Sequence, residues 1–238
     1  MKTAYNAEIF ASFRADIRAA MESRANMYGL LSCLYEKEAD KELLDTLCSM
    51  RMPASTGNAH VDAGYKLLAR YLNGRWERTE EELRIDYFRA FLGNGVDGNG
   101  AAYPFESVHT SPDRVMMQDA RDEVLTLYRA EGMAKSETWK DGEDHIALEL
   151  AFEKVVCEKC VRLLDAGEDE QAMDKIQVQY HFLQDHLNNW VPLMMEDMLR
   201  FAKTDFYHGV AQLTSGFLEN DEEFLGELLE ALTGDADD

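Results

Sequence analysis

The chain has 238 residues, of which 46% are hydrophobic and 29% charged, and its 46 acidic and 24 basic residues give a formal net charge of −22 at pH 7. A chain of this size can bury a full core, as one large domain or as two small lobes. A surface this acidic repels nucleic acid and anionic membranes and favours basic partners. We therefore expect no nucleic-acid partner, while a charge that serves only solubility stays an open alternative.

The N-terminal segment does not resemble a secretory signal. Glu8, Arg14 and Asp16 interrupt any apolar core there. No apolar run approaches the roughly 20 residues needed to span a bilayer. The four cysteines are too few for a disulfide framework. These features predict a cytoplasmic protein without membrane insertion.

Apolar residues recur at the three- and four-residue steps of an α-helix along most of the chain, and no stretch has the two-residue period of a strand. The pattern predicts an all-α fold, a compact bundle of about ten helices. Thr79 with Glu82 fits a capping box, and Ser111-Pro112 fits a helix start. The expected helices cover about 4–20, 24–37, 41–50, 60–72, 79–91, 112–132, 141–164, 168–192, 194–203, 206–218 and 222–232.

A Gly- and Pro-containing stretch at 93–111 divides the predicted helices. It separates an N-terminal helical part (1–92) from a C-terminal helical part (112–218), which an acidic extension (219–238) follows. Its first six residues fit G-x-G-x-x-G, but a helix precedes them and none follows directly, so a dinucleotide site is not expected. We interpret the stretch as a flexible hinge loop.

Residues 141–195 are expected to form a helical hairpin that turns at Gly167, with Asp141 capping its first helix. In an antiparallel pair, position 145 faces about position 189, so His145 comes level with His186 and Trp190 at about 1.5 Å per residue. Two histidines, the acids beside His145 and an indole would gather at one open end. This end of the hairpin is a candidate binding site.

Catalytic signatures are missing from the sequence. It has no G-x-S-x-G, HExxH or P-loop motif, so we predict no catalytic residues, no metal and no cofactor. Cys157 and Cys160 lie three residues apart on a predicted helix, where they can take a metal, cycle as a disulfide or pack as small apolar residues. Packing is the favoured interpretation.

Several short motifs resemble the TorD/DmsD-like chaperones, which mature molybdenum oxidoreductases. Glu143-Asp144-His145 is similar to the family's E-(P)-x-D-H signature without its proline. The aromatic-x-x-Leu-Phe signature is similar to 87–91, with Ala90 in the Leu place. Further resemblance lies in 25–31, in Pro104-Phe105-Glu106-Ser107-Val108-His109 and in His186-Leu187-x-x-Trp190-x-Pro192. The motifs keep the family's order from about residue 22 to 210.

The resemblance implies a cytoplasmic chaperone without a catalytic step. Such proteins hold the twin-arginine signal peptide of a molybdoenzyme catalytic subunit until its molybdopterin cofactor is loaded, so the expected partners are that leader and the body of the enzyme. The resemblance also implies a monomer or a domain-swapped dimer.

The residues themselves fit such a role. Glu143 and Asp144 can pair with arginines, and aromatic side chains can line a groove for an apolar peptide. The complete predicted site is Tyr87, Phe91, Glu106, Glu143, Asp144, His145, His186 and Trp190. A metal- or redox-active protein using Cys157 and Cys160, and a generic acidic helical adaptor, remain as alternatives.

Overall fold

The computed structural model describes residues 5–93 and 100–233, and this part of the chain contains helices and no strand. The predicted all-α class is therefore confirmed. The helical elements are α1 (Ala7–Glu36), α2 (Lys41–Ser49), α3 (Ala59–Asn73), α4 (Thr79–Phe91), α5 (Glu106–Thr110), α6 (Asp119–Ala130), α7 (Ile146–Ala166), α8 (Asp169–Phe182), the π-helical η1 (Leu183–Leu187), α9 (Asn188–Phe201) and α10 (Asp205–Thr233).

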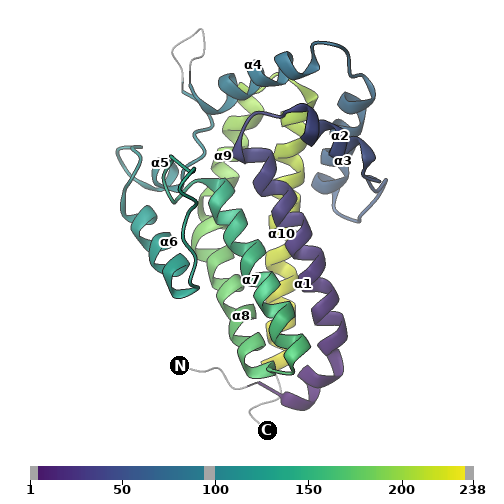
Figure 1. The fold of residues 1–238 in the computed structure, drawn as a ribbon, viewed down its shortest axis with the longest axis vertical. Coiled ribbons are helices and arrows are strands. Elements are labelled where there is room, and N and C mark those ends of the chain that lie inside the picture. Colours follow the sequence, from purple (N-terminus) through teal and green to yellow (C-terminus); the bar gives the residue numbers. More distant parts are fainter. Residues whose placement is uncertain (1–4, 94–99, 234–238) are drawn as a thin grey trace.

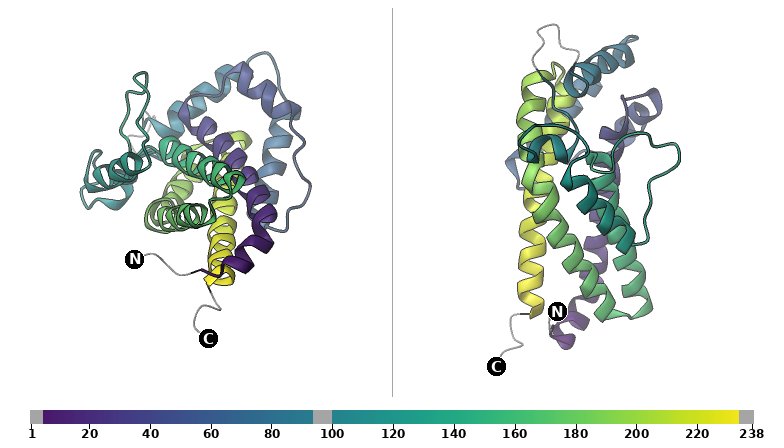
Figure 2. Two further views of the ribbon diagram at one scale, coloured as in Figure 1. Left: turned by 60° about the horizontal axis from the view of Figure 1, so that its bottom comes forward. Right: turned by 90° about the vertical axis from the view of Figure 1, so that its left-hand side faces the viewer.

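Four long helices, α1, α7, α8 and α10, run side by side and enclose the core (Figure 1). Helices α2, α3 and α4 lie around one end of this bundle, where α3 packs along α10. Helices α5 and α6 lie on its flank, as the second view in Figure 2 also shows. The start of α1 meets the end of α10, where the Asn6 N–H donates to the Leu232 carbonyl at 2.9 Å.

Two predicted helix breaks are wrong. The segments expected at 4–20 and 24–37 form the single helix α1, and those expected at 206–218 and 222–232 form the single helix α10. Neither junction contains a glycine or proline that would end a helix. Arg24 and Asp221, which lie at these two junctions, pair with each other in the core.

The predicted hairpin turn is confirmed. Gly167 has a φ of +74°, the left-handed conformation that glycine adopts readily, and its N–H donates to the carbonyls of the last turn of α7. The returning arm is continuously helical from Asp169 to Phe201, but its middle, Leu183–Leu187, is π-helical. Such π-bulges are common at functional sites. This one carries His186.

Three predicted helix starts differ from the structure. The Thr79 hydroxyl accepts from the Trp76 N–H at 2.9 Å and forms no capping box. Helix α6 begins at Asp119, because Arg114 and Met117 adopt positive φ in the loop after Ser111. The cap of α7 is His145 and not Asp141; Glu143 and Asp144 form a turn before it, and His145 itself lies in an antiparallel bridge with Phe105.

The predicted hinge lies partly outside the described residues, because 94–99 are not among them. The described remainder packs onto the bundle: Ala101 and Ala102 are buried, and the Ala102 N–H donates to the Ala90 carbonyl of α4 at 2.8 Å. Helix α5 follows and packs against α9. The division of the chain at 93–111 stays a prediction.

A buried ion pair joins α1 to α10. The Arg24 guanidinium donates from Nε to Asp221 Oδ1 at 2.6 Å and from Nη2 to Oδ2 at 2.8 Å. The Tyr28 hydroxyl donates to the same carboxylate, and Gln179 of α8 accepts from Arg24. Burial disfavours the charge on Arg24, but the adjacent Asp221 outweighs this and keeps its pKa well above the usual range.

We expect Asp221→Ala to lower the free energy of unfolding by about 3 to 5 kcal/mol, because it leaves the Arg24 charge buried without its hydrogen-bonded partner. Urea denaturation measures this loss. Asp165→Ala is the matched control, since it removes an equivalent partner from the exposed Arg18 and should leave the urea midpoint nearly unchanged. Equal midpoints for the two variants would contradict the role of the buried pair.

Candidate functional site

Five of the predicted site residues meet around α5, and together with Ser107 and Glu149 we call them the α5 network. The predicted members are Glu106, Asp144, His145, His186 and Trp190. The Glu106 carboxylate lies 3.0 Å from His186 Nδ1. The backbone N–H of Glu106 donates to the Asp144 carbonyl at 2.9 Å. The Ser107 N–H donates to Asp144 Oδ2 at 3.0 Å. Helix α5 is thus fastened on one side to the start of α7 and on the other to η1.

Glu149 is a fully buried carboxyl of the α5 network that the sequence did not single out. The Trp190 indole N–H donates to its Oε2 at 3.0 Å. Burial, together with the neighbouring Glu106 carboxyl, raises the pKa of Glu149 well above its usual range. Two buried carboxyls this close cannot both ionise cheaply, so Glu149 favours its neutral form. Glu149 follows His145 by four residues, about one helical turn, and this spacing on α7 was the signal that sequence reasoning missed.

His145 is buried rather than open to a ligand. Its ring packs edge-on against Phe105 and Trp139, with centroids 5.0 and 5.1 Å away. Its Nδ1 accepts from the Ala147 N–H at 3.1 Å and so caps α7. Burial lowers the pKa of His145 to about 3, so the ring is neutral at physiological pH. It positions the helix start and carries no charge.

The two acids beside His145 already have partners inside the protein. Glu143 pairs with Arg121 at 2.6 Å and with Lys135 at 2.9 Å. Burial alone would raise the pKa of Glu143, but hydrogen bonds from both cations outweigh burial and hold it below the usual range. Asp144 is fully buried, and its Oδ1 has no hydrogen-bond partner among the described residues.

Tyr87 and Phe91 belong to a different cluster. Their rings lie 4.8 Å apart on the inner face of α4 and contact Tyr207 of α10. The Tyr87 hydroxyl donates to the Tyr35 carbonyl at 3.2 Å. The predicted site residues therefore divide between the α5 network and this aromatic cluster, and Glu143, which pairs with Arg121 and Lys135, belongs to neither.

Cys157 and Cys160 face the core and are fully buried. The Cys157 thiol donates to Gln179 Oε1 at 2.9 Å. Burial raises the pKa of both thiols, that of Cys160 to about 12, which disfavours the thiolate needed for metal binding or disulfide exchange. Within 5–93 and 100–233, no three His, Cys, Asp or Glu side chains are grouped to hold a metal ion. This geometry favours packing for the two thiols.

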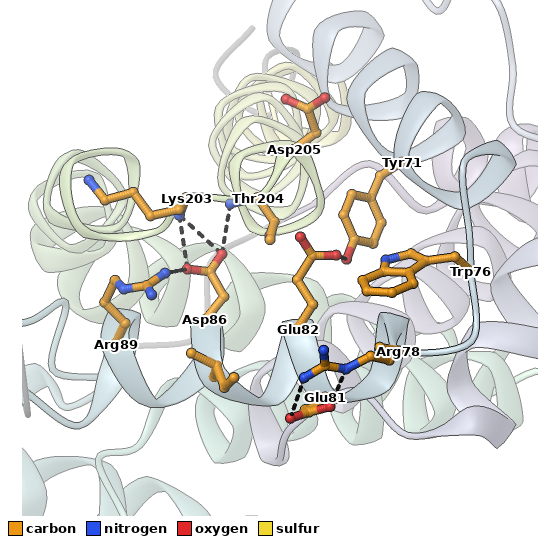
Figure 3. A pocket seen from close by; sticks show the side chains of 11 residues that line it. Tyr71, Trp76, Arg78, Glu81, Glu82, Asp86, Arg89, Lys203, Thr204 and Asp205 are labelled. Carbon is orange, nitrogen blue, oxygen red and sulfur yellow. Dashed lines mark hydrogen bonds and ion pairs between the residues drawn. The ribbon is translucent and has the colours of Figure 1, made fainter.

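An accessible cavity of about 550 Å³ lies where α4 faces the start of α10, and we call it the α4 cavity (Figure 3). Its floor is Asp86, which is buried and accepts from the N–H groups of Lys203 and Thr204. At its rim, Glu82 accepts from the Tyr71 hydroxyl at 2.8 Å, and no Lys or Arg of the described chain pairs with it. Its walls include Tyr71, Trp76, Arg78, Glu81, Glu82, Ile85, Arg89, Lys203, Thr204 and Asp205.

An exposed apolar strip adjoins this cavity. Ile85, Phe88 and Leu92 recur at helical steps on α4 and are 49%, 41% and 47% exposed, and Trp76 before the helix is 53% exposed. Large apolar side chains gathered on a surface indicate an interaction site. The signal was present in the sequence: α4 carries a second apolar stripe in addition to the buried face that includes Tyr87 and Phe91.

Comparison with known proteins places this sequence in a family. The sequence profile of the nitrate reductase delta subunit family matches residues 58–196. The chain is 26% identical to the chaperone protein TorD of Vibrio parahaemolyticus over 216 residues, which cover 88% of this chain and 98% of the relative. It is 24% identical to TorD of Vibrio cholerae over 221 residues (90% and 97%) and 23% identical to TorD of Shewanella piezotolerans over 216 residues (86% and 93%).

The helical fold and these matches define a chaperone of the TorD kind, a class that is not enzymatic. The chain belongs to the nitrate reductase delta subunit family. None of the helices in the described parts of the chain is long and apolar enough to cross a membrane.

The raised pKa of Glu149 predicts a pH dependence of stability. The unfolded chain ionises this carboxyl near its ordinary pKa, about 4.3. The stabilisation from the neutral folded form is complete below that pKa and is lost as pH rises through the higher folded pKa. Glu149→Gln keeps an acceptor for Trp190 but cannot ionise, so it should lose less stability than the wild type between about pH 5 and about pH 9.

Urea midpoints across that pH range measure the effect. Glu158→Gln is the control, because it neutralises a half-exposed acid on the same helix. Identical pH profiles for the wild type and Glu149→Gln would rule out a neutral buried Glu149.

Proposed function

We propose that this protein is a cytoplasmic chaperone that binds the twin-arginine signal peptide of a molybdopterin oxidoreductase precursor while the cofactor is inserted and export is delayed. Family membership and the likeness to TorD over most of the chain support a chaperone of redox enzymes. They also support the cytoplasmic location expected from the sequence. The body of the catalytic subunit is the second partner in this proposal.

The observation that carries the proposal is the outer face of α4, where a cavity with the acid Glu82, unpaired in the described chain, at its rim adjoins an apolar strip. A twin-arginine leader presents two guanidinium groups followed by an apolar stretch. These two features match the acid Glu82 and the apolar strip beside it. Glu82 can accept a charge-assisted hydrogen bond from an arginine, because no cation of the described chain occupies it. Ile85, Phe88 and Leu92 offer an apolar helix face to the following segment.

Electrostatics favour such a ligand at longer range. The net charge of −22 attracts a basic peptide and speeds its capture, most strongly at low salt. A guanidinium also fits a carboxylate better than an ammonium does, because its planar fork can form two parallel hydrogen bonds. The proposal therefore requires a preference for arginine over lysine, which a generic acidic adaptor would not have.

The eight residues singled out from the sequence act in this proposal as the frame beneath the α4 surface. Tyr87 and Phe91 hold α4 onto the bundle through its inner face. The strap from Ala101 to α5 is bonded to α4 at one end and to the α5 network at the other. The frame residues are Tyr87, Phe91, Glu106, Glu143, Asp144, His145, His186 and Trp190.

We expect Glu82→Gln to weaken binding of a twin-arginine leader peptide by about 10-fold, since a hydrogen bond to a charged group contributes about 1.5 kcal/mol or more. Isothermal titration with that peptide and with a Lys-Lys version measures the change. Glu80→Gln is the matched control, because Glu80 is an exposed acid on the same helix that does not line the cavity.

Wild-type protein should bind the Arg-Arg peptide more tightly than the Lys-Lys peptide, and Glu82→Gln should reduce this difference. Equal affinities for both peptides would support the generic acidic adaptor instead. Equal losses in Glu82→Gln and Glu80→Gln would remove the α4 cavity from the proposal.

Asp144→Ala separates the frame role from direct contact. It leaves the buried Ser107 N–H without its acceptor, so we expect the free energy of unfolding to fall by about 1 to 3 kcal/mol. Leader affinity, measured where the variant is fully folded, should stay within about threefold of the wild type, a change below 1 kcal/mol. A larger loss of affinity with unchanged stability would assign Asp144 to the binding surface itself.

A further inference from the structure

The loop that joins α5 to α6 holds three consecutive apolar side chains at the surface, on the flank of the bundle (Figure 1). Val115, Met116 and Met117 are 46%, 40% and 59% exposed. Met21 and Met194, by contrast, are completely buried in the core. Neighbouring apolar side chains in contact with water cost free energy, so their place at the surface indicates an interaction site.

The backbone of this loop is strained. Arg114 and Met117 adopt φ of +51° and +60°, in the left-handed region that side chains other than glycine rarely enter. Neither residue is an Asn or Asp, the types that tolerate this conformation best after glycine. Such strain persists only where neighbouring contacts impose it, and it gathers at binding and switch regions.

Hydrogen bonds at both ends of the loop impose this conformation. The Arg114 N–H donates to the Ser111 carbonyl at 3.1 Å, and the Val115 N–H donates to the Ser111 hydroxyl at 3.3 Å. The Gln118 N–H donates to the Ser107 hydroxyl at 3.1 Å. Because Ser107 belongs to the buried α5 network, the frame of the protein determines how the apolar side chains are presented.

Helix α9 extends the apolar surface beside the loop. The Arg114 guanidinium lies 3.6 Å from the Asp197 carboxylate, which brings the loop alongside α9. Leu193 lies one turn before Asp197 on the same face of α9 and is 49% exposed. We call residues 115–117 together with Leu193 the loop patch.

Two carboxylates bracket the apolar residues of the loop. Asp113 and Asp119 are exposed, and no Lys or Arg within 5–93 and 100–233 pairs with either. Arg114, the one cation of the loop, is already paired with Asp197. The loop patch therefore favours a segment whose apolar centre is flanked by Lys or Arg. A second copy of this chain, with its charge of −22, would be repelled.

We propose that the loop patch is a second docking surface, separate from the α4 surface, that holds an apolar, basic-flanked segment of the partner polypeptide. Naming that polypeptide as the body of the catalytic subunit rests on the proposed function, whereas the chemistry of the segment rests on the loop patch alone. Incompletely folded chains expose apolar segments of this kind. Methionine suits such a surface, because its flexible and polarisable side chain adapts to partners of different shape.

The test uses short fluorescent peptides with a leucine-rich centre, flanked at both ends by lysines or, in a second version, by aspartates. Anisotropy titrations of the full-length wild type should show tighter binding of the lysine-flanked peptide, by about fivefold at low salt. Met116→Ser with Met117→Ser should weaken that binding by about 10-fold, since it removes two apolar contacts. Asp113→Asn with Asp119→Asn should bring the affinities for the two peptides within about twofold of each other.

Phe88→Ser is the matched control, because it removes an exposed apolar side chain from α4 instead. It should weaken the twin-arginine leader and leave the lysine-flanked peptide unchanged, whereas the double methionine variant should do the reverse. Met117→Gly separates docking from folding: glycine adopts a φ of +60° freely, so the thermal midpoint should not fall although peptide affinity does.

The loop patch is overturned if the wild type does not bind the lysine-flanked peptide, if the double methionine variant binds it as the wild type does, or if Phe88→Ser abolishes that binding. Equal affinities of the wild type for both peptides would overturn the basic-flanked occupant. Each of these results leaves the leader proposal standing. A leader that fails to bind the wild type, with the peptide results as expected, would instead remove the leader proposal and keep the loop patch.

Discussion

The fold depends on two buried carboxyl groups of α7, Glu149 and Glu153, which stand one turn apart and have no exposure to solvent. A buried carboxyl is costly unless a partner or a proton compensates it. Glu149 is met by the Trp190 indole from α9, and Glu153 lies 3.7 Å from the Arg24 guanidinium of α1. Arg24 is in turn held by Asp221 of α10. The partners that the buried carboxyls of α7 require come from α9 and α1, and through Arg24 from α10, so these contacts fix how the three helices align with α7.

This constraint explains how the inner and outer faces of the molecule divide their roles. The α5 network holds the strap, η1 and the start of α7 together through buried hydrogen bonds, in which the neutral His145 caps a helix and Glu106 bridges to His186. Its residues have few free polar groups to offer a ligand. The outer face of α4 is the opposite, because exposed apolar side chains and the rim acid Glu82 remain available there. A rigid frame beneath an adaptable surface suits a protein that holds a peptide without acting on it.

The α4 cavity has its structural cause in the short helices at one end of the bundle. It lies between α4 and the start of α10, where α3 and α4 pack around the end of the long bundle. Along the bundle itself, the long helices run side by side and their core is filled, as the buried sulfurs of Cys157 and Cys160 illustrate. The surface proposed for the leader therefore lies at this end of the molecule, whereas the loop patch lies on the flank.

The sequence by itself determined the all-α class, the helical hairpin with its turn at Gly167, and the resemblance to the TorD/DmsD-like chaperones, because helical periodicity and left-handed glycine are local properties. It also singled out Glu106, Asp144, His186 and Trp190 among its eight candidate site residues. Only the tertiary structure decided that these residues are buried and already paired. It also decided that Arg24 and Asp221, 197 residues apart in sequence, join α1 to α10, and that the second apolar stripe of α4 stays exposed. Local pattern fixes which face of a helix is apolar, but burial depends on whether a neighbour covers that face, and the neighbours come from distant parts of the chain.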